Sequence, residues 1–231
     1  MNLFARGTAM ALTVTAAITQ YFSPCRNLER DGYCLITSLN DARTLKSAVL
    51  SQLPVGYHFL NYKYTITGYP LITYHRDVTS CQTSFNTTYP TYTAIHYNYA
   101  GDFLSVAEGS HVSWTLGLPV TLGGKKNTVI LFNADLVHAG VEAPPEVARV
   151  ATQYKIAHLD DFQKLEHLQD ISMTQTGKVA PQGLFSLFLR VASYVCTVPI
   201  QMFARSLLQE RQAGLAGYLQ RLFPLQYFNK A

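Results

Sequence analysis

The spacing of hydrophobic residues changes twice along the chain and divides it into three parts. Residues 8–22 carry apolar positions at helical spacing. From Tyr57 to His158, short runs of β-branched and aromatic residues alternate with Gly, Pro and Asn breaks. Helical spacing returns from Asp160 onward. This order predicts a β-rich core with helices before and after it.

The central part contains several short predicted strands and no long helix. The predicted strands are Tyr33–Ile36, Tyr57–Thr67, Leu71–His75, Tyr92–Tyr97, Phe103–Val106, Thr128–Phe132 and Arg149–Ile156. A helix is predicted from about Asn40 to Leu53, with apolar residues repeating on one face. Short strands at this spacing favour an antiparallel sandwich or barrel and argue against a parallel βαβ fold. We therefore expect an α+β chain.

The pattern predicts three segments. They are an N-terminal helical segment at 1–27, a β core at 28–160 and a C-terminal helical extension at 161–231. In the extension, Leu184–Val195 and Ile200–Phe223 have helical spacing, and Gly177–Gly183 reads as a linker. Arg190 and Pro199 interrupt its most apolar stretch, which favours a buried or interfacial helix over a membrane-spanning one.

Composition adds one point to this picture, the position of the net charge of +4. Residues 162–231 hold seven Lys/Arg and three Asp/Glu, and the rest of the chain is neutral. A mildly basic tail is too weak a signal for nucleic acid, so no nucleic-acid partner is expected. The C-terminal helices either contact an anionic membrane peripherally or present an ordinary solvated face. The four cysteines have no CxxC spacing, which favours reduced thiols and a cytoplasmic location, with peripheral membrane attachment as the variant.

Three residues in the β core have the chemistry of a metal site. His75 and Asp77 end a β-type run and lie two residues apart, so their side chains can point to one face of a strand. His138 follows the hydrophobic run that begins at Thr128. Two imidazoles and one carboxylate suit Fe(II), Mn(II) or Zn(II) and leave open positions on an octahedral ion. A turn after His138 leads to a strand that returns Arg149 close to it.

The order HxD, distal His and an Arg eleven residues later resembles the Fe(II)/2-oxoglutarate-dependent dioxygenases, in particular the phytanoyl-CoA dioxygenase-like branch. Glu29–Ile36, Glu108–His111 and Phe132–Gly140 resemble further segments of that branch. The resemblance covers about residues 28–158. It implies a double-stranded β-helix (jelly-roll) core in which an oxygenase domain of residues 28–160 binds Fe(II) and the co-substrate 2-oxoglutarate.

The resemblance also implies a role for each site residue. His75, Asp77 and His138 would ligate iron, and Arg149 would pair with the distal carboxylate of 2-oxoglutarate. Relatives often have a hydroxyl residue two positions after this arginine, where this chain has Ala151. Tyr64 or Thr128 is expected to supply that hydroxyl instead. The carboxylate at position 77 favours hydroxylation over halogenation.

Two functions stay open at this point. The first is a dioxygenase that hydroxylates a small organic or lipid-like substrate and releases succinate and CO2. The second is a non-catalytic jelly-roll protein that has kept a metal site, and the missing hydroxyl at Ala151 is the feature in its favour. The sequence does not identify the substrate, because pocket-mouth loops determine it and no motif names a chemical group.

Overall fold

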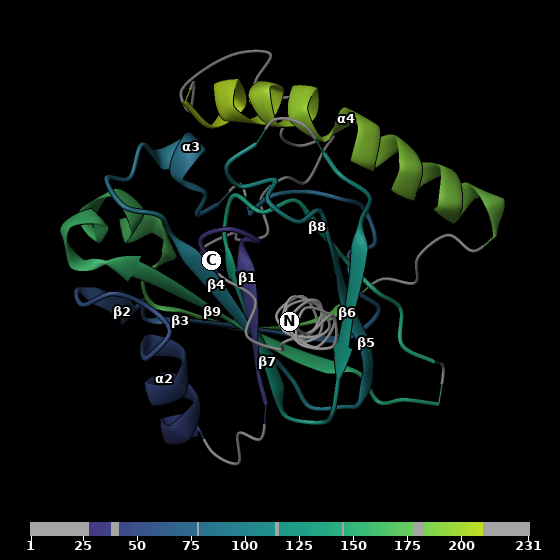
Figure 1. Cartoon of the computed structure of the whole chain (residues 1–231), viewed down its shortest axis with the longest axis horizontal. Coiled ribbons are helices and arrows are strands. Elements are labelled where there is room, and N and C mark those ends of the chain that lie inside the picture. The colour runs from purple at the N-terminus through teal and green to yellow at the C-terminus, as the bar shows by residue number, and fades with distance from the viewer. Residues whose placement is uncertain are drawn as a thin grey trace, which may run out of the picture.

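The computed structural model describes residues 28–37, 42–77, 79–113, 116–144, 146–177 and 183–209. The helix predicted at residues 8–22 lies outside these ranges. Most of the described chain forms two β-sheets that face each other, and helices lie on their outer sides (Figure 1).

The larger sheet holds seven strands and is antiparallel except at one edge. Its order is β1 (Tyr33–Ile36), β7 (Thr128–Asn133), β4 (Tyr92–Tyr97), β9 (Val150–His158), β3 (Tyr62–Gly68) and β10 (Ile171–Gly177), and β2 (Tyr57–Phe59) pairs with β9 beside β3. β10 runs parallel to β3, with Ile171 opposite Tyr62. The β4, β7 and β9 strands form its centre.

The smaller sheet has three strands and closes the sandwich. Its order is β6 (Val120–Gly124), β5 (Gly101–Val106) and β8 (His138–Gly140). Side chains alternate between the two faces of each strand, so the inward set fills the space between the sheets. Tyr97 and Phe103 stack there with ring centroids 4.3 Å apart, and both are fully buried. This is the jelly-roll architecture that the sequence resemblance implies.

Helices cover the outside of the sheets. α2 (Ala42–Leu50) packs Leu45 and Val49 against the face of the larger sheet that points away from the sandwich. The short helices are α3 (Gln82–Phe85), η1 (Leu159–Asp161) and η2 (Gln163–Leu168). The long helix α4 (Leu184–Gln209) crosses the molecule at the top of Figure 1. Within the described ranges, no helix combines the length and the apolar character needed to cross a bilayer.

Four local predictions of secondary structure were wrong; three are described here, and the fourth, at Pro199, follows in the next paragraph. The run Tyr57–Thr67 is two strands, because the chain turns at Leu60 and Asn61. Leu71–His75 is not a strand and forms only one bridge, at His75. The segment contacts β8 at Leu71 and His75, but the Ile72 carbonyl and the Tyr74 N–H bond to side chains of α4. The region after residue 160 contains 3-10 helices and a strand before its long helix.

The strand and the long helix of that region each have a physical reason. Ile171–Gly177 is rich in strand-compatible residues and pairs along the edge of β3. Pro199 does not split the C-terminal helix in two: α4 continues through it to Gln209. The larger sheet therefore extends past the position where the sequence pattern turned helical.

Candidate metal site

The backbone places His75 and His138 directly opposite each other. The N–H of His75 donates to the His138 carbonyl over 2.9 Å, and the reverse bond has the same length. In such a pair the two side chains lie on one face, and here the ring centroids are 4.4 Å apart. The bridge thus joins the segment after Leu71 to β8 at the two histidines.

The orientation of each imidazole is fixed by a backbone carbonyl two residues earlier. His75 Nδ1 is 2.8 Å from the Thr73 oxygen, and His138 Nδ1 is 2.8 Å from the Leu136 oxygen. Each Nδ1 therefore carries the proton that it donates, which leaves the Nε2 lone pair for another partner. Metal-binding histidines are commonly held by such a second hydrogen bond.

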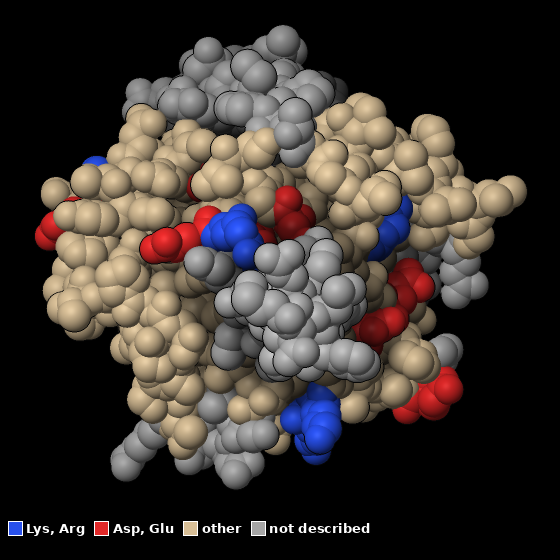
Figure 2. Space-filling model, viewed as in Figure 1, with Lys and Arg blue, Asp and Glu red and all other residues tan. Residues whose placement is uncertain are grey.

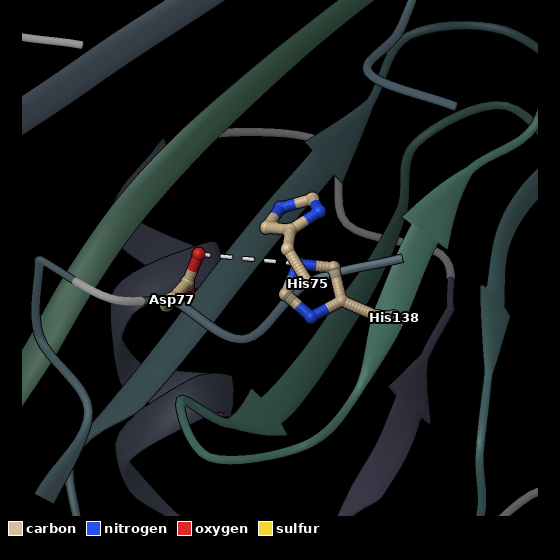
Figure 3. A group of neighbouring side chains, drawn as sticks. All are labelled: His75, Asp77 and His138. Atoms are coloured by element: carbon tan, nitrogen blue, oxygen red, sulfur yellow. Dashed lines mark ion pairs between the residues drawn. The ribbon is translucent and has the colours of Figure 1, made fainter. Parts of the chain in front are cut away.

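Asp77 completes the group. One ligand atom from each of His75, Asp77 and His138 lies within 4.8 Å of the others (Figure 3). The backbone N–H of Asp77 donates to the Ala134 carbonyl over 2.9 Å, which ties this residue to the end of β7. Oδ1 of Asp77 is 3.9 Å from Nε2 of His138. Two neutral imidazoles and one carboxylate converge on one point, and such a set fits a divalent transition metal.

The other carboxylate oxygen of Asp77 is held by a buried lysine. Lys155 Nζ donates to Asp77 Oδ2 over 2.6 Å, and it also donates to Thr93 Oγ1 at 2.9 Å and Ser80 Oγ at 3.0 Å. The Thr93 hydroxyl donates to the same carboxylate oxygen. All of the ammonium protons are therefore used. The carboxylate turns Oδ2 toward Lys155 and Oδ1 toward the histidines.

Burial and neighbouring charges fix the protonation states of the three residues. Burial opposes ionisation of Asp77, but Lys155 and the neighbouring His138 hold the pKa of this carboxyl well below its usual range. Burial lowers the pKa of His138 to about 4, with a further lowering from His75. Burial also lowers the pKa of His75. At neutral pH the group is thus one carboxylate and two neutral imidazoles, the state that binds a metal without first losing a proton.

A cavity opens from this group along the inner face of the larger sheet. β3 contributes Tyr62, Tyr64 and Ile66, β4 contributes Ile95 and Tyr97, and the β9 side contributes Arg149, Ala151 and Gln153. Leu104 and Gly140 close it from the smaller sheet. The walls are mostly apolar or aromatic. Their charged residues are Asp77 of the histidine–aspartate group, Arg149, and Arg76, whose Nη2 donates to the Ser110 carbonyl over 2.8 Å.

Arg149 is buried beside this cavity with an unused donor. Its side chain is 6% exposed, and Nε has no hydrogen-bond partner among the described residues. Nη1 makes only a long contact of 3.5 Å, to the Gly68 carbonyl. Burial raises the pKa of Tyr97, and Arg149 opposes this rise, so the two groups are neighbours. The Arg149 side chain also hydrogen-bonds the Tyr99 side chain, so Nε is its unsatisfied donor. A buried donor without a partner is costly, and this one fits a carboxylate that arrives with a ligand.

The structure separates the two hydroxyl residues expected near Arg149. Tyr64 lines the cavity, and its hydroxyl donates to the Gln175 side chain on β10. Thr128 is buried at the start of β7, where its hydroxyl donates to the Lys125 carbonyl over 2.7 Å. Thr128 is not among the cavity-lining residues. Ala151 lines the cavity as the inward neighbour of Arg149.

Sequence reasoning missed Lys155 and Thr93. A signal for the lysine was available, because positions 149, 151, 153 and 155 alternate onto one face of a strand. Once Arg149 points into the cavity, Lys155 must point inward as well, three alternations further along β9. The partner of Lys155 could not be predicted, because β4 and β9 bring Thr93 and Lys155 together across the sheet, where they are opposite residues.

No family model matches this sequence, and no curated protein matches it. Solved structures do match in fold. EvdMO1 has 14% identity and a TM-score of 0.40, with 69% of this chain and 45% of that chain covered. HygX from Streptomyces hygroscopicus, solved with nickel and 2-oxoglutarate bound, has 13% identity and a TM-score of 0.43, with 57% and 84% covered.

SnoN, a non-haem alpha ketoglutarate (2-oxoglutarate) dependent epimerase from nogalamycin biosynthesis, has 14% identity and a TM-score of 0.42, with 62% of this chain and 84% of that chain covered. The similarity of this chain to these three structures is one of fold. The chain spans less than half of EvdMO1. Likeness at this level carries no information on substrate or reaction, so both are inferred below from the site residues.

Proposed function

We propose that this protein is an Fe(II)- and 2-oxoglutarate-dependent oxygenase that oxidises a small organic or lipid-like substrate. One observation carries the proposal: an oriented group of two histidines and one carboxylate shares a cavity with a buried arginine that has an unused donor. A fold alone would need neither feature. Together they match a metal ion and a dicarboxylate bound side by side.

In this proposal His75, Asp77 and His138 hold Fe(II) through Nε2, Oδ1 and Nε2. The donor set fits, because both Nδ1 atoms are already engaged and Oδ2 is held by Lys155. With three protein ligands, an octahedral ion keeps three positions for other groups. When bound, iron and 2-oxoglutarate supply the oxidising chemistry, in which O2 is reduced and 2-oxoglutarate is converted to succinate and CO2.

Arg149 is proposed to bind the distal carboxylate of 2-oxoglutarate. A guanidinium presents two parallel N–H groups to a carboxylate, and burial strengthens both bonds. Tyr64 is the proposed second partner, because it lines the same cavity and its hydroxyl can turn from Gln175 to a ligand. Thr128 is left out of the proposed site because its hydroxyl is held at the end of β7.

The cavity walls support the substrate class. Ile66, Ile95 and Leu104 line the middle of the cavity, and Pro70 and Leu71 lie on its side near α4. These residues offer contact area to an apolar molecule and few polar groups to orient a sugar or a nucleobase. The carboxylate at position 77 fills the place that a halide would need, so hydroxylation is the proposed reaction.

A cytoplasmic location stays a prediction.

One observation favours the second candidate, a non-catalytic metal-binding jelly-roll protein. Lys155 already neutralises Asp77 in the metal-free chain, so the carboxylate does not depend on a metal for its charge partner. A site that is satisfied without metal could persist for stability alone. The unused donor of Arg149 argues the other way, because it contributes nothing to a purely structural site.

The test is an anaerobic titration of the protein with Fe(II) and 2-oxoglutarate, followed by visible absorption. Chelation of iron by an oxo-acid gives a weak charge-transfer band. We expect the band in the wild-type protein, its loss in His75→Ala and a much higher 2-oxoglutarate requirement in Arg149→Ala. His58→Ala is the matched control, because His58 is exposed and does not line the cavity.

The outcomes separate the two candidates. Absence of the band in wild-type protein that still binds Ni(II) or Mn(II) would favour the non-catalytic jelly-roll. If Arg149→Ala reaches the full band at the same 2-oxoglutarate concentration as wild type, Arg149 has no role in binding the carboxylate. If the band appears as expected, a screen for succinate release identifies substrates.

A further inference from the structure

The helix α4 presents two different faces, and its inner face is fixed to the segment that leads into His75. Arg190 Nη1 donates to the Ile72 carbonyl over 3.1 Å and to the Gly140 carbonyl over 3.0 Å. The Tyr74 backbone N–H donates to the Ser193 hydroxyl over 2.8 Å. These bonds attach the helix to both backbone segments that carry the histidine pair.

Aromatic packing holds the same face. The rings of Tyr194 and Tyr74 meet edge to face with centroids 4.7 Å apart, and the Arg190 guanidinium lies over the Tyr74 ring. The Tyr194 hydroxyl also donates to the Gly117 carbonyl, in the segment before β6. Arg190, Ser193 and Tyr194 of α4 thus point inward, although polar residues of an ordinary surface helix face the solvent.

The outer face of α4 is apolar and uncovered by any described residue. Its large hydrophobic side chains are between 54% and 85% exposed: Leu184, Phe185, Leu187, Phe188, Val191 and Val195. Leu118, next to the Gly117 that Tyr194 contacts, is 90% exposed. In Figure 2 the upper right, where Figure 1 shows α4, is mostly tan, with a blue basic group at its lower edge.

Such a surface calls for a covering partner, and the charge of this part of the chain indicates which one. Single exposed hydrophobic residues are normal, but a contiguous stripe of this size marks an interaction site. From Ile171 to Ala231 the sequence has six Lys/Arg and one Asp/Glu, and α4 contains no acidic residue. Arg190 is held on the inner face of α4 by the Ile72 and Gly140 carbonyls, so the basic charge available to a partner comes from the other five. An apolar helix face in a basic segment fits a lipid membrane, which has an apolar interior and, where its lipids are anionic, negatively charged headgroups.

We propose that α4 docks this protein on anionic lipid membranes, with its apolar face in the headgroup region and its axis along the surface. Interfacial helices bind in this way through buried apolar area and attraction between basic residues and anionic lipids. In this proposal the helix lies on the membrane and does not cross it. This agrees with the finding that no described helix is long and apolar enough to cross a bilayer. This docking does not depend on the proposed oxygenase activity.

Docking would bring the membrane close to the cavity. Arg190 bonds to Ile72, and the neighbouring Leu71 lines the cavity and is 38% exposed. A lipid-like molecule could therefore reach the cavity from the surface on which α4 lies. This extension rests on the proposed function, whereas the docking itself can be tested without any turnover.

The experiment is co-sedimentation of the full chain with vesicles of phosphatidylcholine alone and with vesicles that also contain phosphatidylserine. We expect the protein to sediment with the phosphatidylserine vesicles and much less with the neutral ones. The double variant Phe185→Glu/Phe188→Glu should bind the anionic vesicles at least roughly tenfold more weakly, because two apolar anchors become charged. Val55→Glu is the matched control, since Val55 is fully exposed on the turn before β2.

Circular dichroism and a thermal melt establish that the double variant is folded, as the exposure of both phenylalanines predicts. Equal sedimentation of wild type and the double variant would overturn the proposal. Recovery of wild type in the supernatant with both kinds of vesicle would do so too, and equal binding to neutral vesicles would remove the anionic assignment. Light scattering adds a last outcome: a dimer that the double variant splits, without vesicle binding, would assign the apolar face to a second copy of the chain.

Discussion

Replacing Lys155 with methionine removes the positive charge beside Asp77 and keeps a side chain of similar length. In the folded protein the ammonium lies 2.6 Å from Asp77 Oδ2, and the two side chains are 2% and 9% exposed. At an effective dielectric constant of about 20, opposite unit charges at 2.6 Å attract by about 6 kcal/mol, and the loss of hydration of both groups offsets much of this. The net value of the pair is therefore modest.

Breaking the pair has a larger effect, because Asp77 stays buried without its partner. We expect Lys155→Met to lower the free energy of unfolding of the metal-free protein by about 3–5 kcal/mol. A divalent ion at the site restores a positive charge beside the carboxylate. Added Ni(II) should therefore stabilise the variant more than it stabilises wild type, and the variant should bind the ion more tightly because the repulsion from Lys155 is gone.

The assay is urea unfolding followed by far-ultraviolet circular dichroism, with chelator and then with excess Ni(II). Lys63→Met is the control, because Lys63 is exposed on β3 and should change the free energy of unfolding by less than about 0.5 kcal/mol. The double variant Asp77→Asn/Lys155→Met should recover part of the loss, since both charges are gone. The reasoning fails if metal-free Lys155→Met is as stable as Lys63→Met, or if Ni(II) stabilises wild type and variant equally.

Three further predictions concern the same site. Arg149→Gln should weaken 2-oxoglutarate binding by roughly 100-fold, since a charge-assisted pair contributes about 2–3 kcal/mol, and calorimetry with Ni(II)-loaded protein should show unchanged metal binding. His75→Ala should weaken Ni(II) binding at least roughly 100-fold by competition with a chelating dye, and a loss of equal size in His58→Ala would contradict the ligand assignment. Because the pKa of His138 is about 4 in the folded chain and ordinary in the unfolded one, only the unfolded chain gains this proton as pH falls from about 6.5. The metal-free protein should then lose up to roughly 3 kcal/mol between pH 7 and pH 4 in urea titrations, and a flat profile over that range would refute a buried neutral imidazole.

The sequence by itself determined the elements whose pattern is local. Runs of β-branched and aromatic residues located β1, β4 and β7 closely. In β7 the run is continuous because the strand is buried on both faces. The spacing of His75 and Asp77, with a distal His138, was also readable, because two residues apart on an extended backbone share a face. Their convergence within 4.8 Å agrees with that spacing.

Tertiary structure decided the features that depend on contacts between distant segments. Ile171–Gly177 became a strand because it pairs along the edge of β3, and α4 continues through Pro199 to Gln209. Lys155 became the partner of Asp77 only because the sheet brings together residues separated by 78 positions. The hydroxyl of Thr128 donates to a local carbonyl, whereas Tyr64 lines the cavity and its hydroxyl donates to Gln175 on β10, although both are strand residues that carry a hydroxyl. A sequence fixes which faces are apolar by short-range periodicity, whereas the pairing of those faces depends on the packing of the whole chain.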